Sequence, residues 1–181
     1  FHDSELNLMN RAHSAQESTS CVKTAQDVGI TNISIDLIFG VQGSTLESWQ
    51  SNLQNAIDLD VPHMSCYNLT VEPKTALAHM VKVGKISDVD DELSAQQFGL
   101  TMGLLGSKGY DHYEISNYAR DGLLSNHNTN YWKSVPYLGL GASAHSYDGS
   151  DRSWNIANNA LYLQSITQDT VPITVESLSH K

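Results

Sequence analysis

The sequence predicts an α/β fold built on parallel strands. Two segments rich in β-branched and aromatic residues, 32–39 and 64–71, are typical of buried strands. Between them, residues 44–57 carry apolar side chains at helical spacing. A strand, a helix and a second strand in succession form a crossover unit in which the two strands run parallel. We therefore expect an open α/β sheet or a barrel.

Two helices are predicted ahead of the first strand. Residues 4–12 show a short helical pattern. A second helix starts after Ser14, because Glu17 stands three residues later and completes a capping box. Gly29 provides the glycine that commonly ends a helix.

The first strand has one apolar face, formed by Ile33, Ile35, Leu37 and Phe39. In a parallel sheet or barrel this face packs on helices, so Asp36 should point to the other, inner side. A carboxylate there needs a partner. Three alternatives stay open: a ligand hydroxyl or ammonium, an arginine such as Arg11, or a structural ion pair without any ligand.

The first strand is followed by a loop between Gly40 and Gly43, after which Ser44 and Glu47 suggest a second capping box. The second strand, 64–71, lies between two prolines.

Beyond the second strand, residues 75–88 look irregular and 90–108 form a long helix. Residues 110–118 resemble a strand, and 120–148 are rich in loops, where functional residues are common.

The charge composition of the chain argues against one class of partner, the nucleic acids. The formal net charge is -10 and no cluster of Lys and Arg occurs, so no nucleic acid partner is expected. No run of about 18 apolar residues is present, and the first residues do not resemble a signal peptide, so we expect a cytoplasmic protein. Cys21 and Cys66 lack the spacing of a metal motif, and we expect both thiols to be buried and reduced.

The segment from His127 to Trp132 is the strongest candidate for binding a flat, metal-bearing ligand such as haem. An imidazole of His127 can ligate iron, and the rings of Tyr131 and Trp132 can cover an apolar macrocycle. A histidine beside aromatic residues is more often hydrogen-bonded at the edge of a core, and this alternative stays open.

A glycine-rich segment, 137–145, formally satisfies the dinucleotide pattern but lacks its strand–turn–helix context. We interpret it as a close-packed strand whose backbone approaches something bulky. His145 at its end is a candidate to share a pocket with His127, and His112 and Tyr113 are further candidates.

Six ordered segments together resemble one family, the radical S-adenosylmethionine proteins related to oxygen-independent coproporphyrinogen III oxidase. Within it, the histidine–aromatic segment and the glycine-rich segment resemble the haem-chaperone branch. The six segments are Leu8–His13, Asn32–Gly40, His63–Pro73, Tyr113–Ala119, His127–Trp132 and Gly139–Ser146.

This resemblance implies the second half of a partial (β/α) barrel over 1–108, then a loop-rich extension of strands and helix over 109–165, and the start of a further domain over 166–181. It implies S-adenosylmethionine, a [4Fe-4S] cluster and haem as cofactors. By position, Arg11 and Asp36 match residues that contact S-adenosylmethionine. His127, as an iron ligand, and the rings of Tyr131 and Trp132 match the haem segment.

The sequence also departs from the family. The three-cysteine motif that holds the cluster does not occur, and Cys21 and Cys66 do not replace it. Val41-Gln42-Gly43 stands where the family usually has Leu-Pro-Gly. Both ends of the chain look cut, so we expect a fragment that lacks the cluster-bearing half and the C-terminal domain.

The resemblance implies a haem chaperone that delivers haem to acceptor proteins, with a transient membrane-protein acceptor among the candidates. The alternative is coproporphyrinogen III oxidase activity in porphyrin biosynthesis, with the same barrel residues binding the cofactor. A third alternative, a plain α/β binding domain without a cofactor, requires Asp36 to form a structural ion pair.

Overall fold

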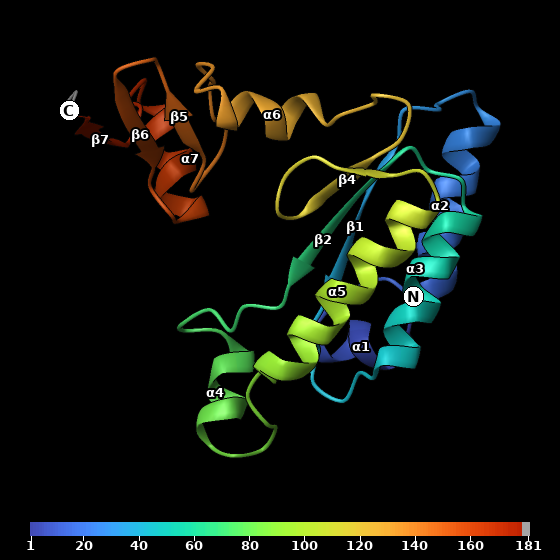
Figure 1. Cartoon of the computed structure of the whole chain (residues 1–181). Coiled ribbons are helices and arrows are strands. Elements are labelled where there is room, and N and C mark those ends of the chain that lie inside the picture. Colours follow the sequence, from blue (N-terminus) through green and yellow to red (C-terminus); the bar gives the residue numbers. More distant parts are fainter. Residues whose placement is uncertain (179–181) are drawn as a thin grey trace. The chain divides into compact units, whose positions relative to one another are not determined.

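The computed structural model describes residues 1–178 and divides into two compact units, Phe1–Ser125 and Asn126–Lys181 (Figure 1). Each unit is described by itself below. The last three residues of the predicted region 166–181 lie outside the described residues. The predicted domain boundaries near 108 and 165 stay predictions.

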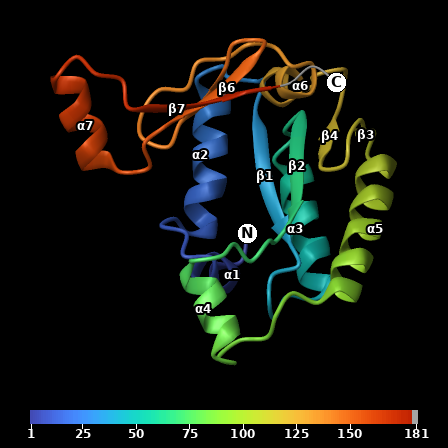
Figure 2. The same ribbon diagram turned by 90° about the vertical axis from the view of Figure 1, so that its left-hand side faces the viewer.

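The first unit contains a mixed four-stranded sheet in the order β1-β2-β4-β3. Its strands are β1 (Ser34–Phe39), β2 (His63–Asn68), β3 (Asp111–His112) and β4 (Asn117–Ala119). The pair β1 and β2 is parallel, as the crossover pattern predicts, and the two strands lie side by side in Figure 2. The pairs β2–β4 and β3–β4 are antiparallel.

The helices of the first unit are α1 (Asp3–Leu8), α2 (Ala15–Asp27), α3 (Leu46–Asp58), α4 (Ala76–Lys82) and α5 (Asp91–Ser107). The helices α3 and α5 pack against each other and against β1. Trp49 of α3 is 2% exposed, and its indole Nε1 donates to the hydroxyl of Thr101 on α5 at 2.8 Å. This contact ties the two helices together on one face of the sheet.

The core lies between this helical layer and the apolar face of β1. Leu37 and Phe39 are buried in it, and Ile33 and Ile35 pack against it partly buried. Asp36 lies between them in sequence and therefore on the opposite face of the sheet. The predicted separation of Asp36 from the apolar face is confirmed, and its direction toward a barrel interior stays a prediction.

One predicted helix start is correct and the other is wrong by one residue. Ser14 and Glu17 form the predicted capping box of α2. The cap of α3 is Thr45 with Ser48, and not Ser44 with Glu47. The hydroxyl of Ser44 instead accepts a hydrogen bond from the side chain of Gln97.

Two further segments of this unit differ from the prediction. The helix predicted over 4–12 ends at Leu8, because the backbone enters the left-handed region at Asn10, with φ 55°. Residues 75–88, predicted to be irregular, contain α4, whose first turn is capped by the hydroxyl of Thr75.

The predicted strand over 110–118 is interrupted by a turn. The carbonyl of Glu114 accepts from the amide of Asn117, and its carboxylate accepts from the amide of Ser116. The chain therefore reverses between β3 and β4, which pair with each other.

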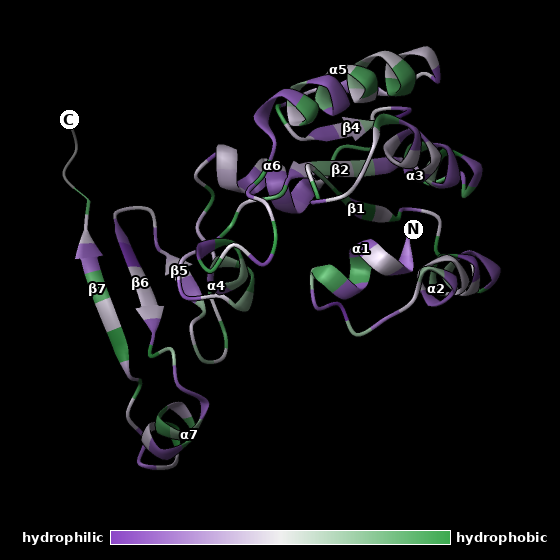
Figure 3. Cartoon of the chain, turned by 90° about the horizontal axis from the view of Figure 1, so that it is seen from below, coloured by the Kyte–Doolittle hydropathy of each residue, from purple (hydrophilic) through white to green (hydrophobic). Residues whose placement is uncertain are grey.

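The second unit contains α6 (Asn126–Trp132), β5 (His145–Tyr147), β6 (Asp151–Asn155), α7 (Asn159–Thr167) and β7 (Ile173–Ser177). The three strands form an antiparallel sheet in the order β5-β6-β7. Hydrophobic residues of α7 and β7 are coloured green in Figure 3, and Leu163 and Val175 are more than half exposed. No helix in the described part of the chain is both long and apolar enough to cross a membrane.

Candidate functional site

Arg11 and Asp36, which are 25 positions apart in the sequence, line the same cavity in the first unit. The cavity has a volume of about 240 Å³ and lies between α1, the segment after it, β1 and α3. His13 lines it as well. The structure therefore places along one cavity the two residues that the family resemblance assigns to one ligand.

Neither Arg11 nor Asp36 forms an ion pair within residues 1–178, and Glu5 is a further charged residue that lines the cavity. Among residues 1–178 the ion pair present joins Arg120 to Asp60, with 2.6 Å between Nη2 and Oδ1. Asp36 and Arg11 are both exposed and take no part in it. No ion pair joins Arg11 to Asp36 within residues 1–178, so the structure does not show Arg11 as a structural counter-ion of Asp36.

His63 lies on the same face of the sheet as Asp36 and is 1% exposed. Its Nδ1 lies 2.6 Å from the hydroxyl of Ser34 and its Nε2 lies 2.8 Å from the hydroxyl of Tyr113. Burial lowers the pKa of the imidazole, against the opposing effect of the Asp36 and Glu114 carboxylates. The sequence prediction placed Tyr113 among the site candidates but did not single out His63.

Gln97 holds the loop that follows β1. Its side chain is fully buried; Oε1 accepts from the amide of Gly40 at 2.7 Å, and Nε2 donates to the hydroxyl of Ser44 and the carbonyl of Thr45. Three polar groups of the loop therefore form hydrogen bonds with one side-chain amide. Sequence reasoning missed this residue, which lies in the middle of α5.

The two cysteines do not form a cluster site. Cys66 is buried, and burial raises the pKa of its thiol to about 12, so it does not supply a thiolate. Cys21 is exposed, which corrects the prediction that both thiols are buried. No group of three or more His, Cys, Asp or Glu side chains in residues 1–178 could hold a metal ion.

In the second unit, His127 pairs with Tyr131 and not with Trp132. The two rings of the pair are perpendicular, with 5.0 Å between their centroids. Residues four apart on a helix lie about 40° apart around its axis, whereas residues five apart lie about 140° apart. Trp132 is accordingly 71% exposed and makes no ring contact within residues 1–178. The prediction that both rings cover one ligand beside His127 stays untested, but the two rings lie on different sides of α6.

The ring of Tyr131 continues into a row of aromatic contacts. It meets Tyr137 at 4.9 Å between centroids, and Tyr137 in turn lies 6.3 Å from Tyr147. The backbones of Tyr137 and Tyr147 exchange two hydrogen bonds, of 2.8 and 2.9 Å. The orientation of the His127 ring is therefore supported by the sheet of the second unit.

The other histidine candidates have different ring partners. The ring of His145 packs against Trp154, with 5.9 Å between centroids. His112, in the first unit, stacks on Tyr118 at 4.4 Å.

The glycine-rich segment forms a loop and not the predicted strand, yet its backbone is closely packed as predicted. A Cβ at Gly139 would collide with the carbonyl group of His145. The amide of Gly139 donates to the hydroxyl of Ser146.

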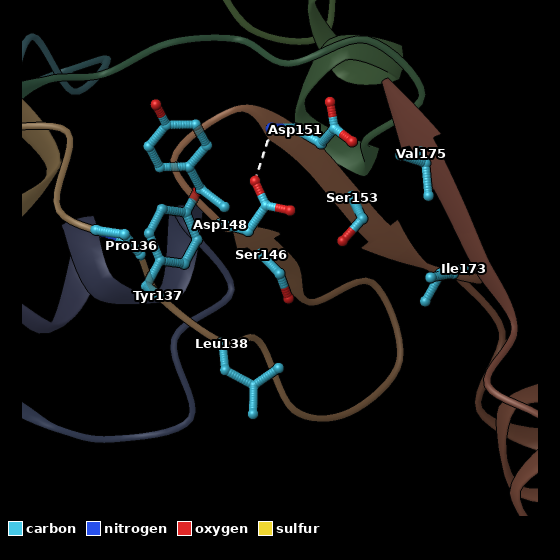
Figure 4. A pocket seen from close by; sticks show the side chains of 10 residues that line it. Pro136, Tyr137, Leu138, Ser146, Asp148, Asp151, Ser153, Ile173 and Val175 are labelled. Carbon is cyan, nitrogen blue, oxygen red and sulfur yellow. Dashed lines mark hydrogen bonds between the residues drawn. The ribbon is translucent and has the colours of Figure 1, made fainter. Parts of the chain in front are cut away.

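A cavity of about 570 Å³ lies next to this loop, between the segment around Tyr137 and the strands β5, β6 and β7 (Figure 4). Its wall combines the rings of Tyr137 and Tyr147 with the side chain of Val175 and the carboxylates of Asp148 and Asp151. Three donors of the turn after β5 hydrogen-bond to Asp148, which lowers the pKa of its carboxyl.

Comparison with known proteins finds several relatives that carry the same name. No family model matches the chain. The haem chaperone HemW of Bacillus subtilis is 34% identical over 95% of this chain and 45% of that protein. HemW of Synechocystis is 35% identical, over 99% of this chain and 44% of that protein. The chain spans about half the length of the curated relatives it matches.

A solved structure, coproporphyrinogen III oxidase (HemN) of Escherichia coli, described as a radical SAM enzyme, superposes with a TM-score of 0.79. The match covers 99% of this chain and 44% of that chain, at 20% sequence identity. At this identity the likeness shows the fold alone. It confirms the predicted α/β fold.

Proposed function

The chain is a HemW-like radical S-adenosylmethionine sequence, and on that premise we propose that its protein binds haem and delivers it to acceptor proteins. The observation that carries this proposal is the agreement between the relatives and the His127 segment. Curated relatives at 34 and 35% identity are named haem chaperones. In this chain the exposed imidazole of His127 is oriented by Tyr131, so that it is available as an axial ligand to iron.

Arg11 and Asp36 are proposed to hold S-adenosylmethionine, the cofactor that the superfamily implies. A guanidinium suits the carboxylate of this cofactor, and a carboxylate suits its ammonium group or a ribose hydroxyl. The shared cavity supports the assignment, as does the absence of an ion pair at either residue within residues 1–178. When bound with a [4Fe-4S] cluster, the cofactor supplies radical chemistry, and the cysteines of this chain do not fit as ligands of that cluster.

Haem titration followed by absorbance tests the proposal on the complete protein. We expect the His127→Ala variant to bind haem at least about tenfold more weakly, because an axial bond to iron is lost. His79→Ala is the control, since it removes an exposed histidine of α4 that is not a candidate for the haem site. Equal haem affinity of wild type and His127→Ala contradicts the ligand assignment.

Coproporphyrinogen III oxidase activity is the second candidate, favoured by the fold of HemN. An anaerobic assay for protoporphyrinogen formation separates the two functions, because only the oxidase releases this product. The acceptor of haem, including the expected transient membrane-protein acceptor, stays a prediction.

A further inference from the structure

We propose that the hydroxyl of Tyr113 is a positioning group for the haem-binding segment, because it holds Ser125, the residue that directly precedes α6. The inference rests on the proposed function, in which His127 in the first turn of α6 ligates haem iron. It is carried by a chain of hydrogen bonds that runs from the sheet of the first unit to Ser125.

The chain of hydrogen bonds begins on β1. The hydroxyl of Ser34 lies 2.6 Å from Nδ1 of His63, its register partner on β2. The Nε2 atom of the same imidazole lies 2.8 Å from the hydroxyl of Tyr113, in the turn between β3 and β4. This hydroxyl accepts a hydrogen bond from the backbone amide of Ser125, with 3.3 Å between the two atoms. The last residue of the first unit is thereby joined to the two parallel strands.

Both ionisable side chains of this chain of hydrogen bonds are neutral near pH 7. Burial lowers the pKa of His63, against the opposing effect of the Asp36 and Glu114 carboxylates. Burial also raises the pKa of the Tyr113 hydroxyl. A neutral imidazole has one donor and one acceptor nitrogen, and each of them faces a hydroxyl that can donate or accept. Every step of the chain can therefore match a donor with an acceptor.

Ser125 is the point at which the segment after β4 returns to the sheet. Residues 121–124 before it and residues 126–127 after it are exposed, whereas Ser125 is partly buried. The backbone amides of residues 123 and 124 donate to carbonyl groups only two or three positions back. The amide of Ser125 instead reaches back 12 positions, to a hydroxyl that is bonded to the buried His63.

The position of Ser125 bears directly on His127. The first amides of a helix have no partner within the helix, so the residue ahead of it sets where the first turn begins. With a rise of about 1.5 Å per residue, His127 lies about 3 Å further along the helix axis than Ser125. Loss of order at Ser125 therefore reaches the backbone of His127, whereas the ring contact with Tyr131 orients only the imidazole.

Tyr113→Phe tests the contact with Ser125. The variant keeps the ring that packs on His63, with 5.8 Å between centroids, and removes only the hydroxyl. In the complete protein without haem, hydrogen exchange of the Ser125 amide should become at least about fivefold faster, because its acceptor is lost. Unchanged exchange overturns the inference.

Tyr110→Phe is the matched control. It removes another tyrosine hydroxyl of the first unit, one that donates to the carbonyl of Val61 at 2.6 Å and lies outside the chain of hydrogen bonds. Exchange of the Ser125 amide should stay within about twofold of wild type in this variant. An equal increase in Tyr110→Phe would show that loss of stability, and not the lost acceptor, releases Ser125, and would overturn the inference.

Haem titration tests whether Tyr113 acts through His127. Tyr113→Phe should weaken haem binding by about threefold or more, and Tyr110→Phe by less than about twofold. In the His127→Ala background, Tyr113→Phe should change haem affinity by less than about twofold, because the group that it positions is gone. Unchanged affinity in Tyr113→Phe, or losses that add in the double variant, overturn the positioning role.

Two outcomes separate this inference from the proposed function and from folding. If wild type binds no haem, the proposed function fails, whereas the exchange of the Ser125 amide still decides whether Tyr113 holds the start of α6. If Tyr113→Phe does not fold, His63→Gln replaces it, since it removes the imidazole that faces the Tyr113 hydroxyl. Exchange of the Ser125 amide should then become about twofold faster or more, and unchanged exchange overturns the inference.

Discussion

The imidazole Nε2 of His63 lies 2.8 Å from the hydroxyl of Tyr113. This hydroxyl also accepts a hydrogen bond from the backbone amide of Ser125. A buried histidine on β2 is thereby joined to the segment after β4. Since Nδ1 of the same ring is bonded to Ser34, both ring nitrogens are used within the protein.

Lowering the pH should destabilise the protein through His63. Burial lowers its pKa below the ordinary value of 6.5, so the unfolded chain binds the proton more readily than the folded one. The free energy of unfolding should therefore be unaffected above about pH 6.5 and should fall as the pH decreases below this value. Urea unfolding between pH 7.5 and 5 measures this slope.

The matched variants for this slope are His63→Gln and His79→Gln, the second replacing an exposed histidine of α4. The slope should become shallower in His63→Gln and stay the same in His79→Gln. An unaltered slope in His63→Gln would contradict the assignment to His63.

Gly40→Ala should be strongly destabilising. The glycine has φ +73°, and a Cβ there would collide with the side-chain oxygen of Asn68 and lie 2.7 Å from the hydroxyl of Ser94. We expect a loss of more than about 2 kcal/mol in the free energy of unfolding, measured with urea. Gly43 has φ +82° but open space around it. Gly43→Ala should therefore lower the free energy of unfolding only by the about 1–2 kcal/mol that the left-handed backbone conformation costs a residue with a Cβ. Equal losses of unfolding free energy in the two variants would show that the contacts of a Cβ at position 40 with Asn68 and Ser94 do not affect stability.

The two thiols should differ sharply in reactivity. Cys21 is exposed on α2, whereas the thiol of Cys66 is buried and has a pKa of about 12. A thiol reagent at pH 8 should therefore modify about one equivalent in the native protein and two in urea. Cys21→Ser should abolish the native reaction. Rapid native labelling of Cys66 would contradict its burial.

Tyr131→Ala should weaken haem binding more than Trp132→Ala. Tyr131 packs edge-on against His127, so its loss frees the proposed ligand ring. Trp132 is 71% exposed, and its removal should change the free energy of unfolding by less than about 0.5 kcal/mol. Haem titration and urea unfolding of both variants test this. A larger loss of haem affinity in Trp132→Ala would instead make Trp132 the ring that covers the ligand.

Local patterns in the sequence predict the framework of the first unit. Alternation along β1 separates Leu37 and Phe39 from Asp36, and the three-residue spacing of Ser14 and Glu17 marks the start of α2. These features depend on neighbours in the chain, and the sequence displays them directly.

Contacts between distant residues were not predictable in the same way. Gln97 holds the amide of Gly40, 57 positions away, and Asn52 meets Glu5 across 47 positions. No local spacing in the sequence predicts such a contact between distant residues. Adjacent positions can also mislead: Tyr131 and Trp132 are neighbours in the chain, yet only Tyr131 contacts His127, because α6 turns successive side chains in different directions.

The antiparallel pairing of β4 with β2 gives the sheet of the first unit a polarity. One edge of β2 is occupied by a strand that runs the opposite way, and its other edge by parallel β1. A further strand that extends the β1–β2 pair in parallel would therefore lie along the outer edge of β1, which no strand of the described residues occupies. That outer edge belongs to the strand that carries Asp36.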